Sequence, residues 1–301
     1  MIVRPRPNAL RMSFSWHGSI LPNILPELTF VIVLSILIAA FERIHPHVFP
    51  ELPVAAFSLI GIALSIFLGF RNNACYDRWW EARKEWGALI VAMRNFARES
   101  LLLPDDVRQR VLYLAIGFAH QLNAKLRKHQ VPPSMQNWLS TSDYQQLCTH
   151  PNPADFILQL IYKELLKCLR TGQLTDICYQ QLTDKIERMS SIQTSCERLQ
   201  NTPLPFAYSL LLHRTAYLYS LLLPIGLGAT LGFATPIVVG VLAYTFFGLD
   251  AIGSEIEEPF GGLDNHLPLD AMVRTIEIDI RSSLGESDVP EPLQPVNYVL
   301  S

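Results

Sequence analysis

Apolar residues gather into long uncharged runs, and these runs predict membrane-spanning helices. Residues 52–70 and 215–249 contain no Asp, Glu, Lys or Arg, and a shorter run, 28–41, reaches a spanning length if it begins near residue 24. About twenty apolar residues cross a bilayer as an α-helix. The longest run is too long for one span, and Gly232 and Pro236 predict a turn inside it. We therefore expect four spans, over residues 24–41, 52–70, 206–231 and 235–252.

Basic residues orient these spans, because Lys and Arg concentrate in cytoplasmic segments. Several flank the outer ends of the first two spans, whereas the loop between those spans holds only Arg43 and the loop between the last two holds none. Both termini are therefore predicted to be cytoplasmic. The predicted order is an N-terminal segment (1–23), spans 1 and 2 (24–70), a cytoplasmic domain (71–203), spans 3 and 4 (204–253) and a C-terminal segment (254–301).

The predicted cytoplasmic domain has helical periodicity and no convincing alternation of strand type. Helices are expected over about 104–129, 153–171 and 175–199, and the proline-rich segment 131–153 is expected to be a loop. The tail after Pro259 is predicted to be irregular at first and to end as an extended arm. The fold class that follows is an all-α integral membrane protein.

The second span continues without a break into an aromatic and charged segment, GFRNNACYDRWWEARKEWGALI, beginning at Gly69. Its aromatic residues recur at steps of three and four, so one long helix is predicted to leave the membrane here. The density of charges and rings indicates a polar junction, although ordinary helix packing near the interface is the plainer explanation. The predicted junction residues are Asp77, Arg78, Trp79, Trp80, Glu81, Arg83 and Trp86.

Three large apolar residues of the second span, Ile62, Ile66 and Phe70, recur every four positions and share one helix face. On spacing alone a lipid-facing or core stripe is the commoner explanation. The alternative is a pore, in which several copies stack the triplet as apolar rings that block ions by dewetting. The small residues Gly61 and Gly69 beside the stripe would let neighbouring helices approach closely.

Composition and motifs narrow the remaining functions. Only 17% of residues are charged and the net charge is −3, which argues against a nucleic-acid partner. No nucleotide, hydrolase, haem or metalloprotease motif is present, so no cofactor or metal is expected. The five cysteines form no CxxC pair and are interpreted as reduced structural thiols.

Four histidines are candidate metal ligands or functional residues. His45 and His47 flank a proline and are more plausible as loop residues than as metal ligands. His120 lies on an apolar helix face and is interpreted as core. His213 and the adjacent Arg214 lie either within the third span or at its cytoplasmic interface, and the sequence favours neither place.

Several segments of the chain are distinctive, namely FRNN, YDRWWEAR, SFSWHGSILP, PLPFAYSLLLHRTAYLYSLLLP and EIEEPFGGLDNHLPLD. Together they resemble the bestrophin channels, in particular their bacterial branch. The resemblance implies a homopentamer around a central pore in a bacterial inner membrane, with four transmembrane helices per subunit and a helical cytoplasmic domain. Its implied partners are copies of itself, the lipid bilayer and monovalent ions.

The resemblance also assigns roles to particular positions. The family's neck residues match Ile62, Ile66 and Phe70, and a second, cytoplasmic constriction is placed near Ile177, with Gln180 as the rival. Animal members bind calcium through an acidic run after PFG. Here only Asp264 and Asp270 remain in the corresponding segment, which argues against calcium gating.

Sodium-like cations are the expected cargo, because the bacterial branch is associated with them and because acids cluster near the end of the fourth span. Those acids, if they face the ion pathway, are Asp250, Glu255, Glu257 and Glu258. The alternatives are a chloride channel and a membrane scaffold that conducts nothing. An enzyme is disfavoured because no nucleophile–base pair is visible.

Overall fold

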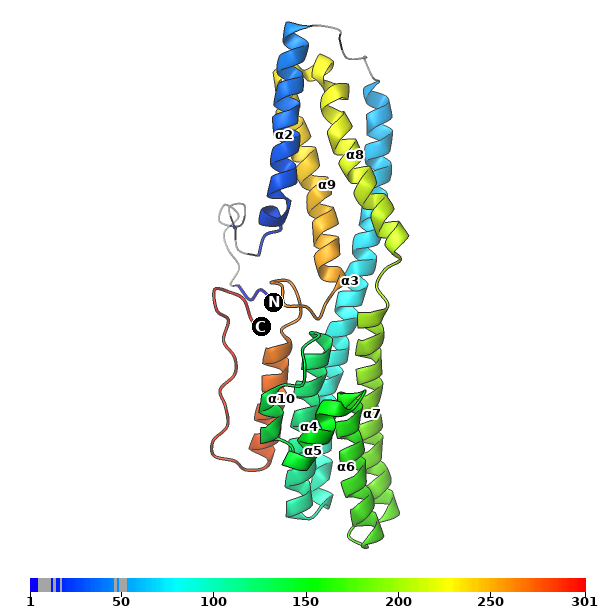
Figure 1. Cartoon of the computed structure of the whole chain (residues 1–301), viewed down its shortest axis with the longest axis vertical. Coiled ribbons are helices and arrows are strands. Elements are labelled where there is room, and N and C mark those ends of the chain that lie inside the picture. The colour runs from blue at the N-terminus through cyan, green and yellow to red at the C-terminus, as the bar shows by residue number, and fades with distance from the viewer. Residues whose placement is uncertain (5–11, 13–14, 17, 46–47, 49–52) are drawn as a thin grey trace. The chain divides into compact units, whose positions relative to one another are not determined.

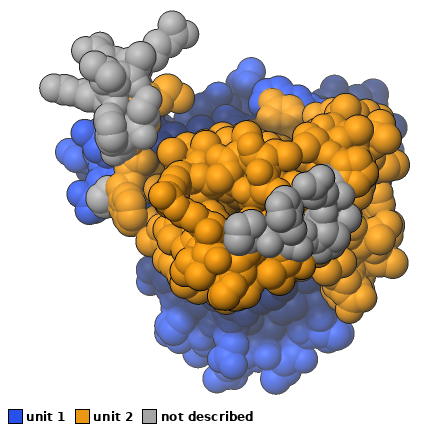
Figure 2. Space-filling model, turned by 90° about the horizontal axis from the view of Figure 1, so that it is seen from above, with its two compact units in different colours: residues 1–4, 80–202, 259–301 blue, residues 5–79, 203–258 orange. Residues whose placement is uncertain are grey.

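The computed structural model describes residues 1–4, 12, 15–16, 18–45, 48 and 53–301 (Figure 1). Within these ranges the chain is helical, and its β-structure consists of isolated bridges without strands. The chain divides into two compact units, coloured separately in Figure 2. Unit 1 comprises Met1–Arg4, Trp80–Thr202 and Pro259–Ser301, and unit 2 comprises Pro5–Trp79 and Pro203–Glu258.

Unit 2 is built from long apolar helices. They are α2 (Leu21–Ile44), the first part of α3 (Val54–Glu99), α8 (Phe206–Leu231) and α9 (Thr235–Glu257). Helix α2 packs against both α8 and α9, which also pack against each other (Figure 1). The short 3₁₀ turn η3 (Gly232–Ala234) joins α8 to α9, and it begins at a positive φ of 52° that glycine adopts without strain.

The expected spans coincide with these helices. Three helical stretches, Leu21–Ile44, Val54–Leu102 and Phe206–Glu257, are long and apolar enough to cross a membrane. The third is divided at η3, where the turn was predicted. Helix α3 continues unbroken from the apolar run into the charged segment, as its periodicity predicted. Within the predicted N-terminal segment, residues 5–11, 13–14 and 17 lie outside the described residues, as does His47.

Helices α3 and α8 interlock through aromatic rings that face glycines. Phe57 of α3 lies against Gly226, where an added Cβ would come 2.2 Å from the ring. Tyr219 of α8 likewise lies against Gly61, with its hydroxyl 2.7 Å from the position of an added Cβ. The expected close approach at Gly61 is therefore confirmed. At Gly69 an added Cβ would meet nothing within 4 Å inside this chain, so a close approach there stays a prediction for a helix of another copy.

Unit 1 is a helical bundle. Its helices besides the end of α3 are α4 (Asp105–Leu126), α5 (Thr141–Thr149), α6 (Pro153–Arg170), α7 (Asp176–Asn201) and α10 (Leu269–Ser283). Helix α4 packs against α6 and α10, and α6 packs against α7. Helices α4, α6 and α7 match the three expected from sequence. His120, predicted to be core, is only half-buried; its ring stacks on Trp138.

One sequence prediction in this unit is wrong, and one helix was not predicted. The expected loop 131–153 contains the 3₁₀ helix η2 (Pro133–Asn137) and α5, whose first turn is capped because the Ser140 hydroxyl accepts from the Asp143 amide. The tail after Pro259 begins and ends without regular structure, as predicted, but between these parts it forms α10, which buries Met272, Val273 and Ile276. Both helices are short, so tertiary packing supplies the stability that their length does not.

The five cysteines are free thiols, in agreement with their interpretation from sequence. Cys168 and Cys196 lie buried in α6 and α7. Burial raises the pKa of both thiols, with nearby carboxylates adding to the effect. A raised pKa keeps a thiol protonated and unreactive, as a structural cysteine requires.

The ring-on-glycine contact can be tested in α8 itself. Gly226→Ala should lower the thermal unfolding midpoint, because the new methyl group would overlap the Phe57 ring and overpacking costs roughly 1–3 kcal/mol. Gly228→Ala is the matched control: its Cβ would meet Ile38 at an ordinary 3.7 Å. We expect that control to match or exceed the wild-type midpoint, since alanine favours a helix by about 1 kcal/mol. Equal midpoints for the two variants in detergent would contradict the interlock.

Candidate functional site

The stripe of three large apolar side chains lies on the outer face of α3 within unit 2. Ile62, Ile66 and Phe70 are 59%, 51% and 60% exposed. The opposite face of the helix carries Leu64 and Leu68, which are fully or almost fully buried in the apolar core. The three residues therefore point away from the rest of their own unit.

The same face of α3 becomes polar after Phe70. Asn73 and Asp77 follow at steps of three and four residues, and both are exposed. An apolar stripe thus gives way to an amide and then to a carboxylate along one line of one helix.

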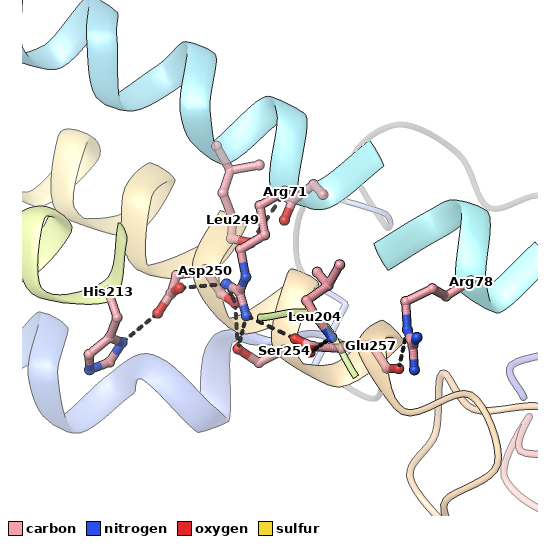
Figure 3. A network of polar contacts seen from close by, with 9 residues as sticks. Arg71, Arg78, Leu204, His213, Leu249, Asp250, Ser254 and Glu257 are labelled. Atoms are coloured by element: carbon pink, nitrogen blue, oxygen red, sulfur yellow. Dashed lines mark hydrogen bonds and ion pairs between the residues drawn. The ribbon is translucent and has the colours of Figure 1, made fainter. Parts of the chain in front are cut away.

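The buried face of α3 also ends in a polar residue, Arg71, and this residue is the centre of a network (Figure 3). Its Nη1 donates to Asp250 Oδ1 at 2.7 Å and to the Asp250 carbonyl oxygen at 3.2 Å. Its Nη2 donates to Ser254 Oγ at 2.8 Å and lies 3.5 Å from Glu257 Oε2. The side chains of Arg71 and Asp250 are only 3% and 9% exposed, so the pair is shielded from solvent.

Neighbouring contacts extend the network along α9. The side-chain nitrogen Nδ2 of Asn72 donates to the Leu249 carbonyl at 3.1 Å, and Arg78 Nε donates to the Glu257 carbonyl at 3.3 Å. Glu257 also accepts from the Leu204 amide at 3.0 Å, just before α8 begins. The close approach depends on Gly253, because an added Cβ there would lie 2.3 Å from Asn72 Oδ1.

A third helix of unit 2 joins the network through His213 of α8. Its Nδ1 lies 2.7 Å from Asp250 Oδ2, so the two oxygens of this carboxylate serve two different helices. The imidazole also packs on Tyr217, with ring centroids 4.3 Å apart. His213 lies in the second turn of α8, while its neighbour Arg214 is exposed.

The four predicted pathway acids do not form one free cluster. Asp250 is buried and bonded to Arg71 and His213, and Glu257 is bonded to Arg71 and Leu204. The guanidinium offsets part of their negative charge. Glu255 is partly buried, and Glu258 is exposed at the end of α9. The electrostatic argument for cations is therefore weaker than the sequence alone indicated.

The predicted junction residues divide between the two units. In unit 2, Trp79 stacks on Tyr76 with ring centroids 6.2 Å apart, and Arg78 joins the network. In unit 1, Glu81 pairs with Arg198 of α7, and Trp86 is fully buried. Trp80 is exposed and Arg83 is half-buried.

The predicted cytoplasmic constriction lies in unit 1. Ile177 is 72% exposed in the first turn of α7, and its rival Gln180 is also exposed, about one turn further along. The hydroxyl of Thr175 caps this helix by accepting from the Cys178 amide. A single exposed apolar residue is ordinary on a protein surface, so the role of Ile177 stays a prediction from the family resemblance.

Among the described residues there is no group of three or more His, Cys, Asp or Glu side chains that could hold a metal ion.

The family of this chain follows from comparison with known proteins. A model of the family described as bacterial/fungal bestrophin protein matches residues 1–282. The chain belongs to the bestrophin family. Its fold agrees with the crystal structure of a bacterial bestrophin homologue from Klebsiella pneumoniae, with a TM-score of 0.85 and 35% identity. That match covers 88% of this chain and 100% of the other.

Two bacterial relatives match this bestrophin over nearly its whole length. A voltage-dependent anion channel-forming protein of Mesorhizobium japonicum is 43% identical over 95% of this chain and 93% of its own. The voltage-dependent anion channel-forming protein YneE of Escherichia coli is 41% identical over 98% of both chains.

Sequence reasoning missed the Arg71 network of this bestrophin, although a signal was present. Arg71, His213 and Asp250 each stand at the edge of an apolar run, where an ionisable residue needs a partner. What the sequence lacked was the pairing, because Arg71 and Asp250 are 179 positions apart.

Removing the buried carboxylate should destabilise this bestrophin far more than removing an exposed one. Asp250→Ala leaves the buried guanidinium of Arg71 without its closest acid, and breaking a buried pair costs about 3–5 kcal/mol. His213 contributes little to this cost because its side chain is 48% exposed. Glu258→Ala, eight positions along the chain, should change stability by less than about 0.5 kcal/mol because its carboxylate is exposed. Thermal unfolding in detergent compares the two. Similar midpoints would show that the buried pair does not contribute as its geometry implies.

Proposed function

We propose that this bestrophin is an ion channel in which several copies surround a central pore lined by α3. The observation that carries the proposal is the outward stripe of Ile62, Ile66 and Phe70. Three large apolar residues at four-residue steps need a covering surface, and around an axis they would form three stacked apolar rings. The two bacterial relatives are named as channel-forming proteins, which supports this function.

The proposed architecture is a homopentamer in a bacterial inner membrane. The four apolar helices of unit 2 would cross the bilayer as spans 1 to 4, and unit 1 would lie on the cytoplasmic side with both termini. The apolar lengths of the helices and the distribution of Lys and Arg support this orientation. Nothing in this assignment calls for an enzymatic reaction.

The proposed neck would control ions through wetting. A narrow ring of isoleucine or phenylalanine offers no hydrogen bond to water, so a narrow segment empties and the ion meets a barrier without any charged filter. Widening the rings lets water return and ions pass. Ile177 is proposed as a further constriction in the cytoplasmic part of the same pathway.

Anions are the first candidate cargo. Both bacterial relatives are named as anion channel-forming proteins, and they match nearly the whole chain. The pairing of Asp250 and Glu257 with Arg71 also reduces the negative charge that would repel anions near the end of α9.

Monovalent cations such as sodium are the second candidate. Asp77 is the observation that favours them, because this exposed acid continues the face of Ile62, Ile66 and Phe70 beyond the proposed neck. A ring of carboxylates at that position would attract cations. The exposed Glu258 would add to the effect if it faces the same pathway.

A reversal potential distinguishes the two candidates. Purified protein in a planar bilayer under an asymmetric sodium chloride gradient should reverse near the chloride equilibrium potential for an anion channel. Reversal near the sodium value would establish the cation channel instead, and Asp77→Asn should then move the potential towards zero. Complete absence of current, in the wild type and in a neck-widened variant, would favour a non-conducting scaffold.

Widening the neck should raise conduction. Ile66→Ala should increase the open-to-closed ratio by on the order of tenfold, because a change of about 1.4 kcal/mol in the cost of wetting is enough for that. Ile36→Ala in α2 is the matched control, since this residue is also 51% exposed but lies outside the proposed pore. Single-channel recording of both variants measures the ratio. Equal ratios would remove Ile66 from the neck.

A further inference from the structure

Arg71 directly follows Phe70, the last residue of the proposed neck, in an unbroken helix. Consecutive helical residues point about 100° apart around the axis. Fixing the direction of Arg71 therefore fixes the direction of Phe70, and of Ile66 one turn earlier.

The hydrogen bonds and ion pairs of the Arg71 guanidinium described above go to α9. They involve Asp250, Ser254 and Glu257, which are spaced by four and three positions and so form one stripe along that helix. The Asn72 contact with the Leu249 carbonyl adds a fourth α9 residue next to this stripe. Two adjacent residues of α3 thus contact about two turns of α9. These contacts define both the rotation of α3 about its own axis and its position along α9.

The other contacts of α3 near the proposed neck are mostly apolar. Phe57, Leu64 and Leu68 are buried in the apolar core of unit 2, and the Tyr208 hydroxyl of α8 donates one hydrogen bond to the Phe67 carbonyl at 3.3 Å. Apolar burial is non-directional, so it specifies the rotation of α3 less sharply than hydrogen bonds do. Hydrogen bonds to a planar guanidinium are directional, and they lie beside the neck residues.

Burial of the pair makes its geometry specific rather than merely favourable. A shielded ion pair adds little net stability because desolvation of both groups offsets their attraction. Moving either partner away would leave a charge buried without compensation, so the position of α3 that satisfies Arg71 is strongly preferred.

We propose that Arg71 is a positioning residue for the neck: by anchoring α3 to α9 it sets the rotation and height of Ile66 and Phe70, and thereby the balance between closed and open pores. This inference rests on the proposed function, since it needs the neck to exist. In this proposal Arg71 contacts no ion itself and acts through Ile66 and Phe70, which do.

The test is an epistasis experiment by single-channel recording of the full-length channel. Arg71→Gln should raise the open-to-closed ratio by about tenfold, the effect expected from losing a hydrogen bond to a charged group. In an Ile66→Ala background, where the ring is already wide, the same substitution should change the ratio by less than about twofold. Size-exclusion elution at the wild-type volume confirms that each variant assembles.

The matched control is Arg94→Gln in the same helix. Arg94 pairs with Asp279 at 2.7 Å but is 48% exposed, so removing this ion pair should leave the ratio unchanged. An Arg71→Gln variant with an unchanged ratio, or with an equal change in both backgrounds, would overturn the anchor.

Two further results of these recordings also distinguish the neck from the anchor. If Arg71→Gln fails to assemble, Ser254→Ala replaces it, because this change removes the 2.8 Å contact with Arg71 and the bond from the Ser254 hydroxyl to the Asp250 carbonyl of its own helix, and keeps the ion pair. We expect a shift of about threefold, and no shift would overturn the inference. If Ile66→Ala itself leaves the ratio unchanged, the neck and the anchor both fail. An effective Ile66→Ala with an ineffective Arg71→Gln leaves the neck in place and removes only the anchor.

Discussion

The buried ion pair between Arg71 and Asp250 is the interaction on which unit 2 depends. A guanidinium shielded from water cannot be left alone, so the helix that carries it must meet an acid at one defined position. Several features of α9 follow from this requirement. Asp250 and Ser254 supply acceptors, and Gly253 between them lets Asn72 and Arg71 come close. The pair thus explains why polar residues interrupt the end of an apolar helix.

Helix α3 combines two surfaces with different duties. Its inner face is tied first by the apolar residues Leu64 and Leu68 and then by Arg71. Its outer face offers Ile62, Ile66 and Phe70 to a surface outside the chain. A helix held firmly on one side can present a rigid row of side chains on the other, which suits a barrier that must open and close in a controlled way.

Local pattern predicted most of the fold, because helices such as α4 and α8 are long and strongly periodic. Prediction failed where a helix is short or follows a misleading segment. Prolines before α5 concealed its start, although Ser140 is a good capping residue. The glycines and prolines before α10 concealed a clear helical pattern that includes Met272 and Ile276.

The candidate site was predictable only in part, for a related reason. The stripe proposed as the neck lies within one helix, so spacing identified its shared face, and the family resemblance supplied the proposed role. The network around Arg71 joins α3, α8 and α9, and no local rule pairs residues so distant in sequence. The same limit explains why Asp250 was interpreted as a pathway acid: its burial becomes visible only when its partners are known.

The position of α10 has a consequence for the order in which the chain matures. This helix packs on α4, and its Asp270 accepts from Asn123 and Arg127, each at 2.7 Å. Between these partners in the sequence lie both α8 and α9. A ribosome therefore releases the two apolar helices before it releases the segment that completes unit 1. One flank of α4 therefore stays uncovered until both apolar helices have been synthesised.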